Sequence, residues 1–381
     1  MTEARYPIIC VGGSAYERGR QHGDLARDRV AKSVEIYRSA FDNVGLTWQQ
    51  ALEKADVFTR VIEASDADIL AEMQGIADGA GFQLEEIVAV NCRTEILFDT
   101  HRKPQGASPH ECTTIAVTPQ ASATGATIIG KNWDWRAACQ ESVIVLQVEQ
   151  DEAADFVMVV EAGMVGRDGF NAAGIAVCGN LLRSIHDGSK PGVPVPFIRR
   201  RVLNSTQLDR ALGAIVNAER AASTNYIVAH ESGIVIDFEA SPNQAYAIHP
   251  ERGLLTHANH FTHVAAEVQQ IGLLAGVDTL YRQQRARDML EPKIGLITVE
   301  DVKAALRDHV GHPHSVCRHP DERQPAGHRS MSIASIVIDL GERVMWVASG
   351  PPCSNEYQAV RLPGESTEGA FDARHASLTA H

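Results

Sequence analysis

The pattern of the chain changes near residue 112, and this change restricts the fold more than any other feature of the sequence. Before this point, charged residues interleave with apolar residues at helical spacing, which predicts helices over residues 16–42, 48–64 and 84–98. A further helix is expected to begin at the capping sequence Ser65-x-x-Asp68 and to be stopped by Gly79 and Gly81. The first 111 residues are therefore predicted to be mainly helical.

Beyond residue 112 most apolar runs are short, as in strands. The predicted strands cover residues 113–117, 126–130, 142–148, 156–160, 175–178, 226–228, 234–238, 332–338 and 343–347, and helices are expected at 206–218, 278–290 and 298–308. A turn of small residues joins the first two strands, which predicts a hairpin. Strand groups that alternate with helix groups predict an α+β protein in which helices cover the sheets.

The charge and length of the chain exclude several classes of partner. The 381 residues carry a net charge of −13 with no compensating basic block, which argues against binding to nucleic acid or to an anionic membrane. No apolar stretch approaches the roughly 20 residues that span a bilayer. The N-terminus carries an acidic residue and only a short apolar run, so no signal peptide is expected and we predict a cytoplasmic protein.

The seven cysteines are an odd number, are widely scattered and form no Cys-x-x-Cys pair. A disulfide framework or a zinc knuckle is therefore not expected, and most of these thiols are predicted to be small buried apolar groups. Cys112 differs because of its neighbours: it is followed by two threonines at the start of a predicted strand, and Asp134 lies about twenty residues on, where the hairpin partner ends.

A thiol and a carboxylate so placed suit a cysteine that cuts its own backbone. A cysteine attacks as its thiolate, and an unperturbed pKa of about 8.5 leaves little thiolate at neutral pH. If Cys112 became a chain terminus, its freed α-amino group, with a pKa of about 8, would act as the base on the same residue. Asp134 would accept hydrogen bonds from that amine and orient it.

Several motifs occur together in one order along the chain: YERGRQHG at 16–23, CTT at 112–114, GKNWD at 130–134, EAG at 161–163, GFNAAGIAV at 169–177 and THANH at 256–260. In this order they resemble the isopenicillin-N (penicillin) acyltransferase family of the N-terminal-nucleophile cysteine hydrolases. The resemblance implies a four-layer αββα fold and a precursor that cuts itself between Glu111 and Cys112. It implies one composite domain built from residues 1–111 and 112–363, and residues 364–381 are expected to form a flexible tail.

The sequence departs from the penicillin enzyme at two points. The residue before the nucleophile is Glu111 where that enzyme has glycine, which bears on the rate of self-cleavage. The hairpin between Cys112 and Asp134 is also longer, which is expected only to lengthen a turn.

The resemblance also implies roles for individual residues. Asn259 is the first candidate for a donor to the oxyanion of a tetrahedral intermediate. Arg329, three residues before a predicted strand, is the expected cation near the nucleophile, with Arg318 as its rival. Asn180 is a second oxyanion candidate, and Thr114 and Thr224 are expected to assist self-cleavage.

Taken singly, each of these residues has a structural interpretation: Asp134 as a turn cap, Asn259 as a left-handed turn residue, the arginines as solvated ion pairs. Their joint occurrence favours an amidohydrolase or acyltransferase that acts on a small N-acyl amide through an acyl-thioester on Cys112, without a cofactor or a metal. Two alternatives stay open. One is a metal-dependent hydrolase that uses the histidines within residues 257–263, and the other is a non-catalytic relative that only binds.

Overall fold

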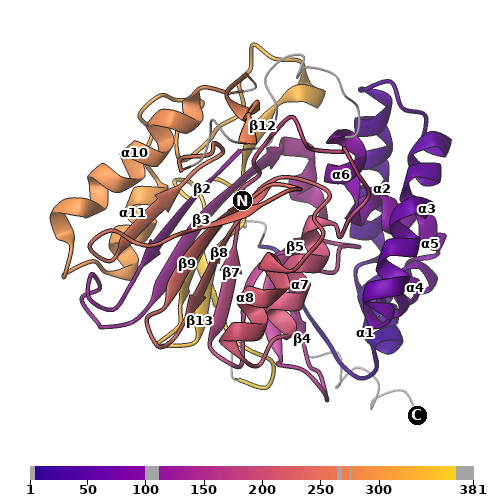
Figure 1. Ribbon diagram of the computed structural model, residues 1–381, viewed down its shortest axis with the longest axis horizontal. Helices are drawn as coiled ribbons and strands as arrows, with labels where there is room; N and C mark the ends of the chain where they lie inside the picture. The colour runs from indigo at the N-terminus through magenta and orange to yellow at the C-terminus, as the bar shows by residue number, and fades with distance from the viewer. Residues whose placement is uncertain (1–4, 99–110, 264–267, 275, 366–381) are drawn as a thin grey trace.

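Two β-sheets lie face to face in the computed structural model, which describes residues 5–98, 111–263, 268–274 and 276–365. The first sheet has eight strands in the order β1-β4-β5-β6-β7-β8-β9-β10, and the second has six in the order β11-β2-β3-β12-β13-β14. Helices cover the outer face of each sheet (Figure 1). This arrangement is the predicted α+β architecture, in four layers.

The strands of the eight-stranded sheet are β1 (Ile8–Val11), β4 (Val143–Val148), β5 (Phe156–Glu161), β6 (Asp168–Asn171), β7 (Ile175–Cys178), β8 (Thr224–His230), β9 (Val235–Ala240) and β10 (Ala245–Ile248). All neighbours in it are antiparallel except β1, which pairs in parallel with β4. Because β1 comes from the otherwise helical N-terminal segment, that segment and the rest of the chain share one sheet.

The strands of the six-stranded sheet are β2 (Glu111–Val117), β3 (Ile128–Arg136), β11 (Leu254–His257), β12 (Ser330–Asp339), β13 (Val344–Ala348) and β14 (Tyr357–Val360). The predicted hairpin is confirmed, since β2 and β3 pair antiparallel with Cys112 opposite Trp133. Alternate residues of β2 face opposite sides of the sheet. Ala116 joins the core between the sheets, whereas Ile115 and Val117 pack with the helices outside.

The described helices are α1 (Ala15–Leu25), α2 (Arg27–Asp42), α3 (Trp48–Ser65), α4 (Ala67–Ala80), α5 (Leu84–Asn91), α6 (Arg93–Phe98), α7 (Val195–Asn204), α8 (Leu208–Val216), α10 (Asp278–Leu290) and α11 (Val299–Leu306). α10 and α11 cover the six-stranded sheet, and α7 and α8 pack on the eight-stranded sheet, with α1–α6 beside them (Figure 1). None of the described helices is long and apolar enough to cross a membrane.

Some predicted boundaries were wrong. The segments 16–42 and 84–98 are each divided into two helices, at Ala26 and at Cys92. Ser65 does not cap α4: its hydroxyl donates to the Val61 carbonyl, and α4 begins without a side-chain cap. Helix α11 begins with a capping box, in which Thr298 and Asp301 make reciprocal hydrogen bonds. Helix α7 was missed, because prolines and a glycine precede it and made the segment resemble a loop.

Glycines bring α1 and α4 unusually close together. A Cβ atom at Gly75 would lie 2.2 Å from the carbonyl oxygen of Tyr16, and one at Gly19 would lie 1.9 Å from that of Glu72. Backbone atoms cannot move out of the way as a flexible side chain can. The close contact between the two helices therefore requires glycine, which has no Cβ atom, at these positions.

We expect Gly75→Ala to lower the free energy of unfolding by about 1–3 kcal/mol, because the added methyl group overpacks the α1–α4 contact. Gly213→Ala in α8 is the matched control, since the nearest atom there is the Asn217 amide nitrogen at 3.4 Å. This control is expected to gain up to about 1 kcal/mol from helix propensity. Urea unfolding followed by circular dichroism compares the two, and equal stability of Gly75→Ala and the unchanged protein would contradict the prediction.

Candidate active site

Cys112 lies where the pairing of its strand ends on one side. β11 pairs with β2 only as far as His257 opposite Thr114. On that edge Cys112 has no strand partner, and side chains make the hydrogen bonds to its backbone that a neighbouring strand would make. The Cys112 N–H donates to Oδ1 of Asn259 at 2.7 Å, and its carbonyl accepts from Nη1 of Arg282 at 2.7 Å. The chain is continuous between Glu111 and Cys112, so this is the geometry of the uncut chain.

Asn259 is held firmly in this orientation. Its backbone N–H donates to Oγ1 of Thr279 at 2.7 Å, and its side-chain nitrogen donates to the carbonyl of Leu181 at 3.0 Å. Its Oδ1 accepts a second hydrogen bond, from Nη2 of Arg282 at 3.0 Å. Two donors therefore direct the amide oxygen of Asn259, and not its nitrogen, toward the nucleophile.

Cys112 and Asp134 lie on opposite faces of the six-stranded sheet. Cys112 is paired with Trp133 and shares its face, so the next residue, Asp134, points the other way. The Cys112 side chain faces the space between the two sheets, whereas Asp134 is fully buried beneath the outer helices. The amine role predicted for Asp134 is not seen in the uncut chain, where the Cys112 nitrogen donates to Asn259.

Asp134 belongs to a buried ionic cluster. Its Oδ1 accepts from Oγ of Ser332 at 2.6 Å, and its Oδ2 lies 3.9 Å from Nε of Arg318. Arg318 and Arg282 both bind Oδ2 of Asp278, at 2.5 and 2.9 Å. Burial raises the pKa of Asp134 to about 7, against the opposing effect of Arg282, and burial lowers the pKa of Arg318 to about 9.

The structure places Arg318 beside Asp134 and Arg329 elsewhere. Arg329 is half-buried and donates to the backbone carbonyls of Gln324 and Glu322. It comes immediately before β12, two residues before Met331, which pairs with Trp135. Arg318 is the one of these two arginines that lies beside Asp134. The sequence spacing used to choose between them took no account of the loop that folds back over the sheet.

Asn180 joins the two threonines that were predicted with it. Its Oδ1 accepts from Oγ1 of Thr114 at 2.7 Å, and its carbonyl accepts from Oγ1 of Thr224 at 2.8 Å. Its side-chain nitrogen donates to the carbonyl of His257 at 2.9 Å. The side chain of Asn180 thus connects β2 to β11 behind the nucleophile.

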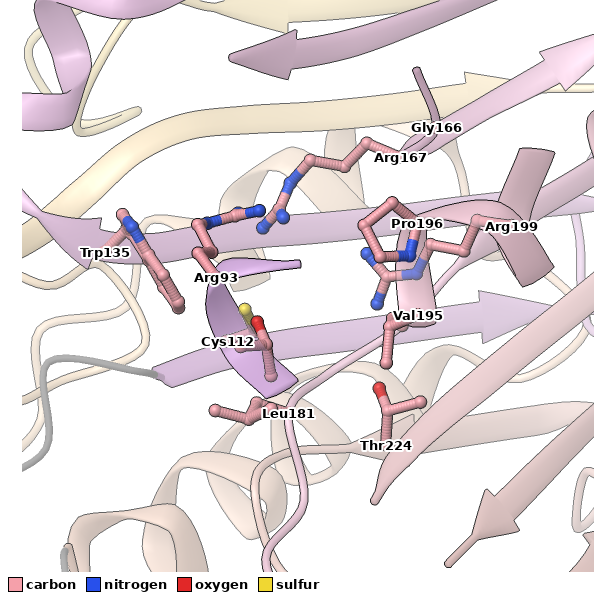
Figure 2. Close-up of a pocket in the computed structure, with 12 residues that line it drawn as sticks. Arg93, Cys112, Trp135, Gly166, Arg167, Leu181, Val195, Pro196, Arg199 and Thr224 are labelled. Atoms are coloured by element: carbon pink, nitrogen blue, oxygen red, sulfur yellow. The ribbon is translucent and has the colours of Figure 1, made fainter. Parts of the chain in front are cut away.

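A small cavity of about 30 Å³ opens beside Cys112 between the sheets. Its lining comes from α6, β2, β3, α7, β8 and the segments before β6 and after β7: Arg93, Thr94, Cys112, Trp135, Gly166, Arg167, Gly179, Leu181, Val195, Pro196, Arg199 and Thr224. This volume holds one or two water molecules. Figure 2 shows the guanidinium groups of Arg93, Arg167 and Arg199 directed toward the space above Cys112.

The charges around the cavity are mostly positive. Lys131 is buried on the Cys112 face and contacts Asp168 and the Gly179 carbonyl, both at 2.5 Å. Asp168 also pairs with Arg199, 3.2 Å from Nη1, and with Arg167, 3.8 Å from Nε. One carboxylate is thus shared among three cations.

These cations do not turn Cys112 into a thiolate in the uncut chain. Burial raises the pKa of the Cys112 thiol, and Lys131 and Arg167 oppose this effect only in part. The thiol is therefore neutral at physiological pH and needs a base for attack.

Among the residues that the structure describes, the histidines within 257–263 are not part of a group that could hold a metal ion. His257 lies between two carboxylates, its Nε2 2.9 Å from Glu239 Oε1, and its Nδ1 contacts the Ala258 carbonyl at 2.8 Å. Asp237 and Glu239 raise the pKa of His257 to about 9 despite its burial, so in this arrangement the ring is a cation paired with carboxylates. His260 turns to Oγ1 of Thr279 instead, at 2.9 Å.

The sequence did not identify Arg282, Asp278 or the cavity arginines as site residues. Arg282 and Asp278 are separated by one helical turn on α10, so their spacing resembled an ordinary surface ion pair. Arg199 lies in a run of three arginines on α7, and it is buried against Asp168. Lys131 lies in the GKNWD motif, whose period-two alternation with Trp133 was the only signal for its inward direction.

Residues 122–353 match the family described as acyl-coenzyme A:6-aminopenicillanic acid acyl-transferase. The chain is 28% identical over 344 residues to the acyl-coenzyme A:6-aminopenicillanic-acid-acyltransferase 40 kDa form of Emericella nidulans, covering 89% of this chain and 91% of that protein. Among solved structures it is similar to a variant of conjugated bile acid hydrolase from Clostridium perfringens, with 13% identity and a TM-score of 0.49 over 68% of this chain and 95% of that one. It is also similar to penicillin V acylase from Agrobacterium tumefaciens, with 13% identity and a TM-score of 0.44 over 66% and 87% of the two chains.

The raised pKa of Asp134 predicts a pH-dependent stability. Because its pKa is about 7 in the folded chain and about 3.9 when unfolded, the folded state holds a proton that the unfolded state has lost. The contribution of Asp134 to stability therefore falls as the pH rises through this window. Asp134→Asn cannot ionise, so its free energy of unfolding should rise relative to the unchanged protein, by at least about 1 kcal/mol between about pH 5 and about pH 8.

This comparison is best made in a Cys112→Ala background, where the chain stays whole. Asp68→Asn, at an exposed position in the first turn of α4, serves as the control and should follow the parent at every pH. Parallel pH curves for Asp134→Asn and its parent would show that Asp134 ionises in the ordinary range.

Proposed function

Since the chain belongs to the acyl-coenzyme A:6-aminopenicillanic acid acyl-transferase family, we propose that it is a self-cleaving amidohydrolase or acyltransferase with Cys112 as its N-terminal nucleophile. The observation that carries the proposal is the placement of Cys112: a buried thiol at a cavity, with its backbone nitrogen held by Asn259. The thiol lines the cavity, and the nitrogen that Asn259 holds belongs to the peptide bond that the proposal cuts.

The first reaction is the cut itself. Sγ of Cys112 loses its proton and adds to the carbonyl carbon of Glu111, and the C–N bond then breaks as the Cys112 nitrogen takes up a proton. The product is a thioester between Glu111 and Cys112, which water hydrolyses to a new carboxyl terminus and a free thiol. Asn259 holds the departing nitrogen, and Arg282 holds the Cys112 carbonyl, so the nucleophile stays in place when the bond is lost.

The freed amine then supplies the base that the buried thiol lacks. Its pKa of about 8 lies close to neutral pH, and it belongs to the same residue as the thiol. Oδ1 of Asn259 remains as its acceptor after the cut. We propose Asp134 as a second group that orients this amine, through the Ser332 and Arg318 cluster on the other face of β2.

The second reaction is acyl transfer from an amide. Sγ adds to the amide carbonyl of the substrate, the amine leaves with a proton, and the acyl group remains on Cys112 as a thioester. Water or a second amine then takes the acyl group and restores the thiol. We propose that the amide nitrogen of Asn259 stabilises the oxyanion, which requires it to turn from the Leu181 carbonyl that it binds in the uncut chain, where its oxygen faces Cys112. Asn180 is the second proposed donor, and its nitrogen binds the His257 carbonyl in the uncut chain.

Arg318 replaces Arg329 as the proposed cation of the site. It is buried, lies 3.9 Å from Asp134 and shares Asp278 with Arg282, the residue that holds the Cys112 carbonyl. A guanidinium here favours the ionised form of Asp134. Its effect on the thiol is indirect, because Asp134 and Arg318 lie across the sheet from Sγ.

The cavity arginines favour a substrate that carries a carboxylate. Arg167 is only 8% exposed, and within the described part of the chain its guanidinium makes no hydrogen bond. It contacts Asp168 only at 3.8 Å and otherwise stacks on the Trp133 ring at 3.5 Å. Buried guanidinium donors without acceptors are costly, and a planar anion satisfies them two at a time. We therefore propose an N-acyl amide whose carboxylate binds Arg167 and Arg199.

Self-cleavage is the first test. Intact mass measurement and N-terminal sequencing of purified protein should give two fragments, the second beginning with Cys112. Cys112→Ala should remain whole, and Asn259→Ala should cut roughly 10–100-fold more slowly, because a hydrogen bond to the reacting nitrogen is lost. Cys10→Ala, which removes a thiol elsewhere, should cut like the parent. A parent chain that stays whole, or a Cys112→Ala chain that cuts, would overturn the proposal.

The substrate proposal is tested with two amides that share an acyl chain and differ only in a carboxylate on the amine part. Arg167→Met should lower kcat/KM for the acidic amide by roughly 10–100-fold and leave the neutral amide nearly unchanged. Arg201→Met is the control, since Arg201 lies on α7 but binds Asp66 away from the cavity. An equal loss on both amides would mean that Arg167 acts on Cys112 or on the fold and not on a carboxylate.

A further inference from the structure

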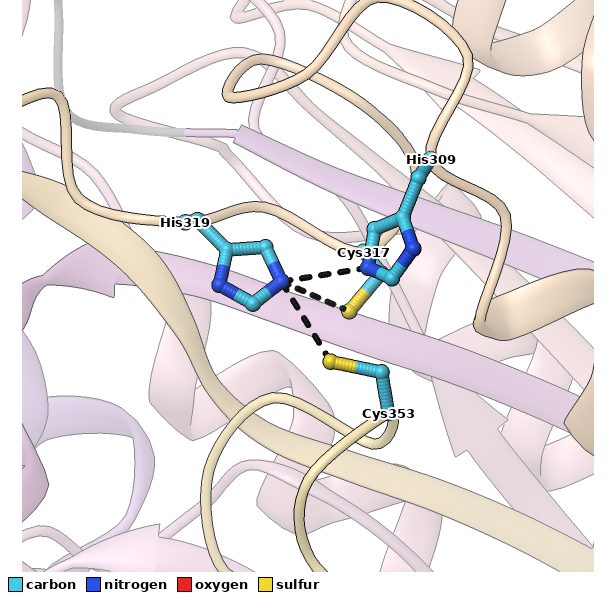
Figure 3. A group of neighbouring side chains, drawn as sticks. All are labelled: His309, Cys317, His319 and Cys353. Atoms are coloured by element: carbon cyan, nitrogen blue, oxygen red, sulfur yellow. Dashed lines mark hydrogen bonds between the residues drawn. The ribbon is translucent and has the colours of Figure 1, made fainter.

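Two histidines and two cysteines lie together away from the proposed nucleophile. Nε2 of His319 lies 3.1 Å from Nε2 of His309, 3.6 Å from Sγ of Cys317 and 3.3 Å from Sγ of Cys353. One ligand atom from each of the four residues lies within 4.8 Å of all the others. In Figure 3 the four side chains converge from three parts of the chain on one point.

We propose that these four residues bind a Zn²⁺ ion. Zinc prefers thiolate sulfur at about 2.3 Å and imidazole nitrogen at about 2.0–2.1 Å in a tetrahedron, which sets the ligand atoms roughly 3.3–3.8 Å apart. The three separations from Nε2 of His319, 3.1–3.6 Å, are close to these values, and the other ligand atoms lie within 4.8 Å of one another. Two sulfurs with two nitrogens are the ligand set of structural zinc and do not suit magnesium or calcium.

Hydrogen bonding alone does not account for the cluster. Nε2 of His319 has either one hydrogen or one lone pair, yet three polar atoms approach it. His309 and His319 also repel each other when both are protonated, and thiols are weak donors. A single cation at the centre satisfies all four atoms at once.

The ion would fix a loop that carries a site residue. Cys317 and His319 flank Arg318, which binds Asp278 and faces Asp134 on the opposite side of the loop from the cluster. His309 follows α11, and Cys353 lies in the turn after β13, so the site joins the loop to a helix and to a sheet edge. Four protein ligands leave no open position, which makes this a structural site that positions Arg318 and not a metal that activates water.

The proposed ligands differ in exposure, which gives an ion access to the site and shows which ligands can be mutated without disturbing the core. His309 and Cys353 are exposed, His319 is half-buried, and Cys317 is buried. Cys353→Ser and His309→Ala therefore remove ligands without opening the core. His312→Ala is a matched control: its ring lies 5.1 Å from that of His319 and 6.1 Å from that of His309, but it is not one of the four ligands.

The test is the metal content of full-length protein purified with a reductant and without a polyhistidine tag. Elemental analysis should find about one zinc per chain in the parent and in His312→Ala, and a clear loss in Cys353→Ser and His309→Ala. Cobalt in place of zinc should give the thiolate charge-transfer absorption in the parent and in His312→Ala, and this band should weaken in Cys353→Ser. Using the Cys112→Ala background keeps the result independent of self-cleavage.

Three outcomes would overturn the proposal. The first is a parent that takes up no stoichiometric zinc even after incubation with zinc and reductant. The second is a set of ligand variants that hold as much zinc as the parent, which would mark an adventitious ion only. The third is a mass measurement, on protein prepared with reductant, that finds Cys317 and Cys353 joined as a disulfide, which would leave no thiolate ligands.

Discussion

The unpaired edge of β2 at Cys112 is the constraint on which the rest of the site depends. A strand residue that loses its ladder partner must find other acceptors and donors for its backbone, because buried polar groups left unpaired are costly. Asn259 and Arg282 fill these places, and each is fixed by further contacts, with Thr279 and Asp278. The same edge leaves the Glu111–Cys112 bond outside the ladder with β11, where a cut does not remove hydrogen bonds between these strands.

Strand alternation divides the site into two environments. Cys112, Lys131 and the cavity arginines lie between the sheets, where burial keeps the thiol neutral. Asp134 and Arg318 lie on the other face beneath α10, where burial raises the pKa of the acid and lowers that of the base. The nucleophile and its ionic support are therefore separated by the sheet, and the backbone of β2 with Asn259 and Arg282 connects them.

Much of this could be predicted from the sequence, and the failures share one cause. The α+β class, the hairpin, the strand β7 and the helix α10 follow from local periodicity, which the structure bears out. Motif order placed Cys112 and Asn259 in one site, and in the structure the backbone nitrogen of Cys112 lies 2.7 Å from Oδ1 of Asn259. The position of Arg318 beside Asp134 and the contact of Arg282 with Cys112 were not foreseen, because both depend on which loop or helix folds over the outer face. Spacing along a chain carries no such information.

The expectation of no metal was also based on spacing along the chain, which does not show which distant residues come together. Zinc sites are readable in a sequence when ligand pairs are close, as in Cys-x-x-Cys, because one turn of chain then fixes two ligands. Here Cys317-x-His319 supplies one such pair, but His309 and Cys353 join it from outside and only the fold brings them near. Cys317 and His319 also flank Arg318, so two proposed metal ligands and the proposed site cation lie in one short loop. If a zinc ion holds this loop, the position of Arg318 depends on the metal content of the protein.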